Sequence, residues 1–511
     1  MLKFPVGPSL AKRMNRNILY VLANAVFGLC VIGALPFAGP GIHPLFLLLL
    51  FALCSTPILS IRRLNDRYAL LGIFSFMYFM WFGNLDFIRM FTGEPVPLAS
   101  DGFMDPAEVL ILLSGVSLQL AYRVMARPSK SIASRPAKDY AEPLLVVGGI
   151  IGWSLTTVLV WKFNVHVISD TSAESIARGL KTLSPLETLG FMLATYLQPC
   201  CIMVLAYALC KYKRFYMFPV VFGVVGVQFI IGLVANGKGL ALSGLIILMV
   251  TKVLVDGKIS KVWLAATLAV IAVAFPVLQA NRVVLGARQQ THASAAQDIL
   301  QTFSRALGAQ EKVNSGEHRA QTIFERISVK DTVEIIVAKT GDGVEFQHGH
   351  TLIPLLTTFI PRVIWADKPS LEIGVGRMVA QSFFPEASSD VFISPSHLGE
   401  LYWNFGGLGA VLGMAVIGAL LGWVGARFEL SESVTLTRVL ILSMTIQILV
   451  QGFESSVANQ YSTWLRLMLG IGVIHVLFAR RLVAREPRDS PPIQAPPLIP
   501  VTAPRFPNLM R

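Results

Sequence analysis

Charged residues are scarce in this chain: 14% of its 511 residues are Asp, Glu, Lys or Arg, while 54% are hydrophobic. A soluble globular domain usually carries about 25% charged residues, so the composition excludes that class. Alternating segments of about 10 residues, which a transmembrane β-barrel would need, are also missing. Apolar runs long enough to cross a bilayer as helices recur instead. We therefore expect an all-α integral membrane protein.

Cysteine is rare as well, and its five positions carry no disulfide or metal-ligand spacing. All five lie within apolar runs, so we expect small buried hydrophobic side chains: Cys30, Cys54, Cys200, Cys201 and Cys210. The chain also has no P-loop and no Rossmann-type glycine pattern. Its net charge of +13 lies mainly in short basic flanks beside the apolar runs, which indicates contact with anionic membrane lipid and no nucleic acid partner.

We predict about twelve transmembrane helices. The first, 18–37, follows a basic N-terminus and reads as an uncleaved signal anchor. Eight more precede residue 281, giving a membrane domain over 1–280, and three lie within 402–480. The spans expected after the first are 45–60, 68–88, 106–126, 143–161, 186–210, 215–234, 240–255, 262–280, 401–424, 434–451 and 464–478.

The charges of the connections alternate along the chain. Basic connections, such as the one with Arg62, Arg63 and Arg67, alternate with connections poor in positive charge, such as Asp86–Asp105. The positive-inside rule then places both termini in the cytoplasm of a bacterium and the long polar stretch 281–401 in the periplasm. The tail 481–511 is rich in proline and is expected to be disordered.

The periplasmic loop is expected to contain amphipathic and re-entrant helices. Residues 317–340 have apolar positions at helical spacing, including Val333 and Ile336. The apolar run 351–365 is interrupted by Pro354 and Pro361 and is too short to cross, so we expect it to dip into the membrane interface.

Basic residues in and around this loop are candidates for binding a diphosphate, because guanidinium and ammonium groups match phosphate oxygens. The alternatives are anchoring to lipid headgroups and, for Lys238 in its Asn-Gly-Lys-Gly segment, a plain tight turn. The candidates are Arg362, Arg288, Arg282, Lys238, Lys368 and Arg377.

Acid–base chemistry has its leading candidates where the loop meets the next apolar helix. His397 and Glu400 would share one helix face at a spacing of three, and either could remove a proton from a sugar hydroxyl. His348 and His350 are weaker acid–base candidates and are also expected to contact sugar. None of these spacings supplies enough ligands for a metal site, so we expect no metal.

Aromatic and glycine residues follow in the same stretch. Tyr402 and Trp403 could stack on sugar rings, although an interfacial aromatic belt is the commoner role for such residues. The recurring glycines of the next span indicate close helix packing: Gly406, Gly407, Gly409, Gly413, Gly418 and Gly422.

Two motifs in this region resemble those of the bacterial oligosaccharide repeat unit polymerases, the Wzy-type O-antigen and exopolysaccharide polymerases. The first motif consists of Pro361, Arg362, Trp365, Lys368 and Pro369. The second consists of Gly399, Glu400, Tyr402, Asn404, Phe405, Gly406 and Gly409. The resemblance covers roughly 346–422. Lys238 stands where relatives tend to carry an arginine, which keeps the charge but loses the bidentate fork.

The resemblance implies a GT-C-like membrane glycosyltransferase that uses undecaprenyl-diphosphate-linked oligosaccharides at the periplasmic face of the inner membrane. Arg362 and Arg288 would lead in holding the leaving diphosphate, with Glu400 or His397 as the base. No cofactor is required, because a diphosphate is a good leaving group, and a chain-length regulator is the expected protein partner. The alternatives are an O-antigen ligase and a transporter or flippase of the same lipid-linked oligosaccharides.

Overall fold

The computed structural model is helical throughout the part of the chain that it describes. Its only β-type pairing there is an isolated bridge between Thr340 and Val344. The described residues are 10–38, 41–61, 63, 65–92, 104–127, 142–164, 185–234, 238–267, 269–270, 328–357, 360, 365, 371–386, 393–430 and 434–483. Contacts divide the chain into two compact units, Met1–Ile471 and Gly472–Arg511.

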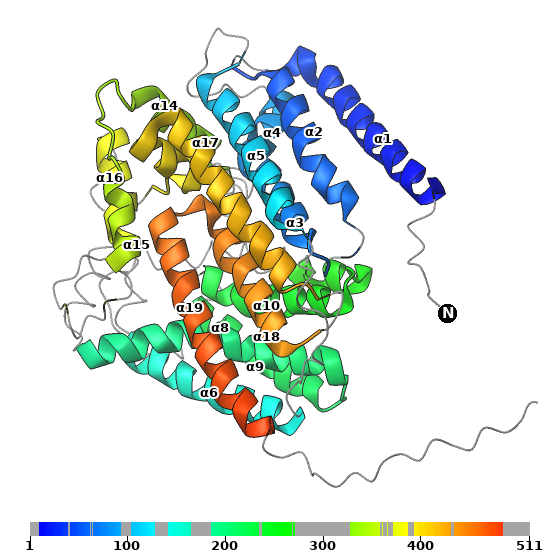
Figure 1. Cartoon of the computed structure of the whole chain (residues 1–511), viewed down its shortest axis with the longest axis vertical. Helices are drawn as coiled ribbons and strands as arrows, with labels where there is room; N and C mark the ends of the chain where they lie inside the picture. Colours follow the sequence, from blue (N-terminus) through cyan, green and yellow to red (C-terminus); the bar gives the residue numbers. More distant parts are fainter. Residues whose placement is uncertain are drawn as a thin grey trace, which may run out of the picture. The chain divides into compact units, whose positions relative to one another are not determined.

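The helices of the first half precede the long polar stretch (Figure 1). They are α1 (Leu10–Ala34), η1 (Leu35–Phe37), α2 (Pro44–Ser60), α3 (Ala69–Phe82), α4 (Asn84–Thr92), α5 (Pro106–Met125), α6 (Glu142–Asn164), α8 (Pro185–Tyr212), α9 (Met217–Val234) and α10 (Lys238–Asp256).

Short helices from the polar stretch come next and lead into the C-terminal helices. They are α14 (Lys330–Lys339), η2 (His350–Leu352), α15 (Ile353–Thr357), α16 (Leu371–Phe383), α17 (Ser396–Arg427), α18 (Leu436–Met444), the π-helix η3 (Thr445–Val450), η4 (Gln451–Glu454) and α19 (Val457–Val483).

Five helical segments of the described part are long and apolar enough to cross a membrane: Ile18–Phe37, Pro106–Met125, Glu142–Leu159, Ser396–Arg427 and Leu436–Glu454. A sixth arises if α3 and α4, which meet at a bend of 45°, form one broken span. Leu408, Leu412 and Val416 are 57–74% exposed at a spacing of four on α17, as expected for a helix face that contacts lipid. The chain is therefore an α-helical protein with several potential membrane spans.

Helices α5 and α17 pack side by side and run in the same direction (Figure 1). A Cβ atom added to Gly418 would lie 2.2 Å from the carbonyl oxygen of Leu118, and one on Gly422 would lie 2.5 Å from that of Tyr122. Only glycine allows the two backbones to approach this closely. The predicted glycine packing is thus confirmed at Gly418 and Gly422, whereas a Cβ on Gly407 would meet nothing within 4 Å.

The parallel arrangement separates acidic and basic groups. Arg123 and Arg427 lie in the last turns of α5 and α17, and the Tyr122 hydroxyl donates to the backbone carbonyl of Arg67. Asp105 and Glu108 lie at the opposite end, where they form the capping box that starts α5. The two helices therefore have a basic end and an acidic end.

Helix α17 starts earlier than the expected span and is broken inside. Gly406 has φ 68° and ψ −169°, a conformation that interrupts the helix and favours glycine. The pairing of Gly418 with Leu118 and of Gly422 with Tyr122 puts this break near the level of the first turn of α5. The chain turns back at this break, because a Cβ on Gly413 would lie 2.7 Å from the side chain of Leu401. The turn bearing His397 and Glu400 therefore packs back along α17.

Two smaller expectations have mixed outcomes. Val333 and Ile336 are buried on one side of α14, as predicted from their spacing, while the part of that stretch before Ser328 lies outside the described residues. Cys54, Cys200 and Cys210 are buried as expected. The prediction was wrong for Cys30, which is exposed on the apolar surface of α1.

Candidate functional site

The break at Gly406 creates a docking place for the polar loop. A break in a helix leaves carbonyl groups without their usual donors four residues later. Here the backbone N–H of Gln347 donates to the carbonyl of Trp403 at 3.0 Å, and that of His348 donates to the carbonyl of Asn404 at 3.1 Å. The loop thus completes the hydrogen bonding of α17 within the Gly399–Gly409 motif.

Glu400 lies at the centre of a buried hydrogen-bond network. Its Oε1 accepts the hydroxyl of Thr351 at 2.7 Å, and its Oε2 accepts the backbone N–H of Val457 at 2.6 Å. Asn404 donates to the same Thr351 hydroxyl at 2.7 Å, and its Oδ1 accepts the N–H of Gly349 at 2.8 Å. Because Val457 is the first residue of α19, Glu400 also acts as an N-cap supplied by another helix. The network fixes the turn from His348 to Thr351.

His397 lies one turn from Glu400 on the same helix, as predicted, and both side chains are fully buried. The imidazole packs edge-on against Phe453 with ring centroids 4.9 Å apart, and its centroid lies 5.5 Å from that of Tyr461. Neither ring nitrogen has a hydrogen-bond partner among the described residues. A substrate cannot reach either group in this arrangement, so their assignment as the base stays a prediction.

The residues predicted to contact sugar divide into accessible and buried groups. His348 and His350 are exposed, at the turn fixed by Thr351. Tyr402 is half-buried, and its neighbour Phe405 is 47% exposed. Trp403 is fully buried, stacks edge-on against Phe383 at 5.2 Å and donates its Nε1–H to the carbonyl of Glu345. The Trp403 ring is thus part of the packed interior. The predicted sugar-contacting residues with accessible side chains are His348, His350 and Tyr402.

Of the six residues predicted to hold a diphosphate, Arg377 alone has a described side chain. It lies on α16, is half-buried, and its buried Nε has no partner within the described part of the chain. Lys238 starts α10, but its side chain is not among the described ones. The remaining four lie outside the described residues: Arg282, Arg288, Arg362 and Lys368.

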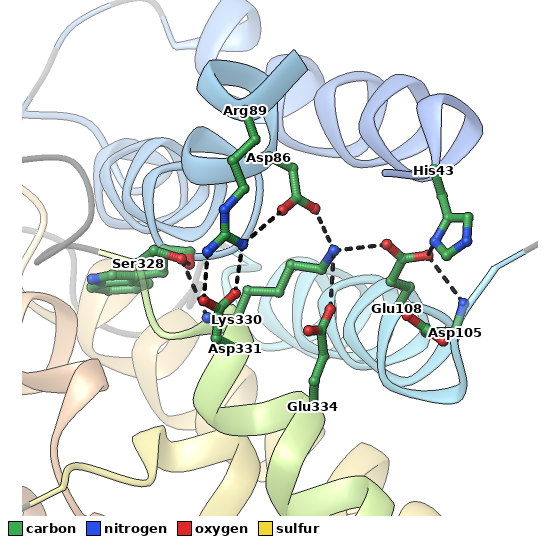
Figure 2. Close-up of polar contacts among 10 residues, drawn as sticks. His43, Asp86, Arg89, Asp105, Glu108, Ser328, Lys330, Asp331 and Glu334 are labelled. Atoms are coloured by element: carbon green, nitrogen blue, oxygen red, sulfur yellow. Dashed lines mark hydrogen bonds and ion pairs between the residues drawn. The ribbon is translucent and has the colours of Figure 1, made fainter. Parts of the chain in front are cut away.

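A second polar cluster connects the loop to the first half of the chain (Figure 2). Lys330, at the start of α14, is 1% exposed and its Nζ contacts three buried carboxylates from three helices. Asp86 of α4 is one partner, Glu108 of α5 lies at 2.8 Å, and Glu334 of α14 lies at 3.1 Å. These negative charges outweigh the opposing effect of burial and raise the pKa of Lys330. The ammonium therefore remains charged inside the protein.

The cluster continues on both sides of Lys330. On one side Arg89 makes a bidentate pair with Asp331, with distances of 2.9 and 2.8 Å. On the other side His43 Nδ1 lies 2.8 Å from Glu108 Oε2, which also accepts the N–H of Asp105. His43, Asp105 and Glu108 thus bring potential ligand atoms within 4.8 Å of one another. The capping box and the Lys330 ion pair account for this proximity, so we assign no metal to it.

Sequence reasoning missed the Lys330 cluster, although a signal was present. Asp86 and Glu108 both fall inside runs predicted to span the membrane, and ionisable residues at such positions usually have a specific partner. Their partner Lys330 lies 244 and 222 residues away in the sequence. A single sequence cannot pair residues across such a distance.

Residues 162–483 match a family model described as "Domain of unknown function (DUF8712)". No curated protein and no solved structure matches the chain. The family match covers more than half of the sequence, including α14, the docked loop and the broken helix α17. The chain belongs to the DUF8712 family.

Proposed function

We propose that the protein is a membrane glycosyltransferase that polymerises undecaprenyl-diphosphate-linked oligosaccharide repeat units at the periplasmic face of the bacterial inner membrane. One observation carries the proposal. The turn with His348 and His350 is held against the Gly399–Gly406 motif by Thr351, Asn404 and Glu400, at the end of a potential membrane span. The Gly399–Gly409 motif of the resemblance and this turn thus form one structural unit, while most of the Pro361–Pro369 motif lies outside the described residues.

The distribution of charge supports the proposed location. The break at Gly406, where the loop docks, lies near the acidic end of α5, and the arginines at the basic end belong to connections that the positive-inside rule assigns to the cytoplasm. A periplasmic site next to the membrane surface suits a substrate with a lipid tail and a sugar head. Two exposed apolar side chains on α15, Ile353 at 48% and Leu356 at 78%, would contact the lipid region.

In the proposed reaction, a hydroxyl oxygen of the acceptor sugar attacks the anomeric carbon of the donor glycan. The bond from that carbon to the diphosphate oxygen breaks, and the hydroxyl proton passes to a base. Arginines would stabilise the negative charge that develops on the diphosphate. Arg377, with its unpartnered Nε, joins Arg362 and Arg288 in this proposed role. The contacts of Glu400 support a positioning role for the His348–Thr351 turn alongside its predicted role as base.

The test uses the purified full-length protein in proteoliposomes supplied with lipid-linked repeat units. We expect the wild type to yield a ladder of glycan lengths. Arg362→Ala and Arg377→Ala should each slow transfer by about 10²–10³-fold, the usual effect of removing one charge-stabilising group. Arg123→Ala is the matched control, because Arg123 is an exposed arginine at the opposite end of the spans, and it should retain the full ladder.

The same assay separates the alternatives. Transfer of a finished glycan to a lipid A core acceptor, without a ladder, would identify a ligase. Movement of lipid-linked units across the membrane without any new glycosidic bond would identify a transporter. Either result would refute the polymerase proposal.

A further inference from the structure

The Lys330 cluster contains a surplus carboxylate. Four carboxylates surround the two permanent cations of the cluster, Lys330 and Arg89: Asp86, Glu108, Asp331 and Glu334. Asp105 accepts a backbone N–H at the start of α5, where the helix dipole favours a negative group. Glu334 has no such compensation, because it shares an ammonium that already has two other carboxylates.

Glu334 also lacks hydrogen-bond donors. Its side chain is 4% exposed, and its Oε1 forms only the 3.1 Å ion pair with Lys330. Within the described part of the chain, neither oxygen of Glu334 has a hydrogen-bond partner, nor does Oδ1 of Asp86. A buried carboxylate that lacks hydrogen bonds is costly, and a bound proton would both remove its charge and turn it into a donor.

We propose that Glu334 is a proton-binding site and that its proton holds the segment Ser328–Thr357 against α4 and α5. Lys330 and Asp331 face the site from α14, Asp86 and Arg89 from α4, and Glu108 from α5, with His43 behind Glu108 (Figure 2). The other helices packed on α14 bring His397 and Glu400 from α17 and Arg377 from α16. None of these three contributes to the shift of the Glu334 pKa described next.

Burial raises the pKa of Glu334 from 4.5 to about 7, with Asp86 adding to the rise and Lys330 opposing it. A carboxyl whose pKa is higher in the folded than in the unfolded protein binds its proton more tightly when folded. Its contribution to stability is complete below pH 4.5 and is lost as pH rises through about 7. The attachment of α14 should therefore loosen in mildly alkaline solution.

The attached segment bears directly on the candidate site. Val333 and Ile336 of α14 pack against Gly399, with a Cβ there 3.5 and 3.0 Å from their side chains. The chain then runs from Thr340 into the turn that carries His348 and His350. Proton release at Glu334 would thus weaken one attachment of the loop, while the ion pairs of Lys330 and Asp331 with α4 and α5 remain.

The experiment measures hydrogen exchange of the α14 backbone amides in the full-length protein in lipid nanodiscs, from pH 6 to 8.5. The ratio of wild-type to Glu334→Gln exchange rates removes the intrinsic pH dependence of exchange. We expect this ratio to rise by up to about tenfold per pH unit above pH 7, as release of one proton requires. The glutamine variant, which mimics the protonated carboxyl, should stay closed throughout. This readout does not depend on glycosyl transfer.

Three results would overturn the proposal. Equal pH dependence in the wild type and Glu334→Gln would show that another group titrates. Loss of the pH dependence in His43→Gln would place the proton on His43. Restoration of protection at pH 8 by sodium, but not by choline, would show that a metal cation fills the site. If Glu334→Gln does not fold, infrared titration of the wild-type carboxylic acid band supplies the test: the acid must disappear near pH 7.

Discussion

Replacement of Lys330 by Met should be among the most damaging single changes in the described part of the chain. The methionine would fill much of the same volume but would leave three buried carboxylates without their shared cation. Removal of one partner from a buried ion pair costs about 3–5 kcal/mol of folding free energy. The cost per carboxylate has an upper limit of similar size, because the group can take up a proton instead, and protonating a carboxyl of ordinary pKa at pH 7 costs about 4 kcal/mol.

The loss of stability in Lys330→Met should depend on pH. Carboxylates left without Lys330 become easier to neutralise as the pH falls, so the cost of the substitution should shrink by about 1.4 kcal/mol per pH unit for each carboxyl that takes up a proton. Between pH 7 and pH 5 the variant should therefore regain about 3 kcal/mol relative to the wild type. Adding Glu334→Gln should change this loss little at pH 7, since without Lys330 the Glu334 carboxyl already holds its proton and the unpaired charges are those of Asp86 and Glu108.

The assay is the apparent free energy of unfolding from SDS titration in mixed micelles, measured at pH 5, 6 and 7. Lys339→Met is the matched control on the same helix, because Lys339 is exposed and donates one hydrogen bond to the carbonyl of Phe383. We expect that control to lose about 1 kcal/mol or less at every pH. A Lys330→Met variant with the same small, pH-independent loss would refute the assignment of a buried, charged centre.

Two further predictions concern α17. Gly418→Val should destabilise the protein by about 1–3 kcal/mol, because the new side chain would collide with the backbone of α5. Gly407→Ala is the control and should change the thermal stability little; equal losses of stability in the two variants would contradict the close packing of α5 and α17. Thr351→Val should leave Oε1 of Glu400 and one N–H of the Asn404 amide without a partner, which should cost about 1–3 kcal/mol and speed hydrogen exchange of the Gly349 amide. Thr357→Val is the control, and unchanged exchange at Gly349 would show that the network does not fix the turn.

The sequence-based predictions succeeded where a feature depends on local pattern. The helical class, the packing glycines at 418 and 422, and the shared helix face of His397 and Glu400 all follow from composition or spacing. One of the two motifs behind the resemblance, Gly399–Gly409, holds the residues that bind Thr351, while most of the other, Pro361–Pro369, lies outside the described residues. The polymerase activity itself stays a prediction.

Features that depend on distant partners were not predictable. The glycines near 406 suggested close packing, but the break there is defined by loop amides that pair with the freed carbonyls. The use of Glu400 as a cap for α19 depends on a backbone N–H 57 residues away. The sequence spacing predicts that His397 and Glu400 lie on one helix, but their burial depends on residues from distant parts of the chain.

The long separation of Lys330 from its carboxylates also has a consequence for biogenesis. Asp86 and Glu108 are synthesised 244 and 222 residues before the lysine that neutralises them. At about 5–20 residues per second, their helices leave the ribosome roughly 10–50 s before Lys330 does. The nascent protein must carry these acids protonated or hydrated during that interval. The ion pairs of Lys330 can therefore join the first helices to the loop only at a late stage, after most of the chain has been synthesised.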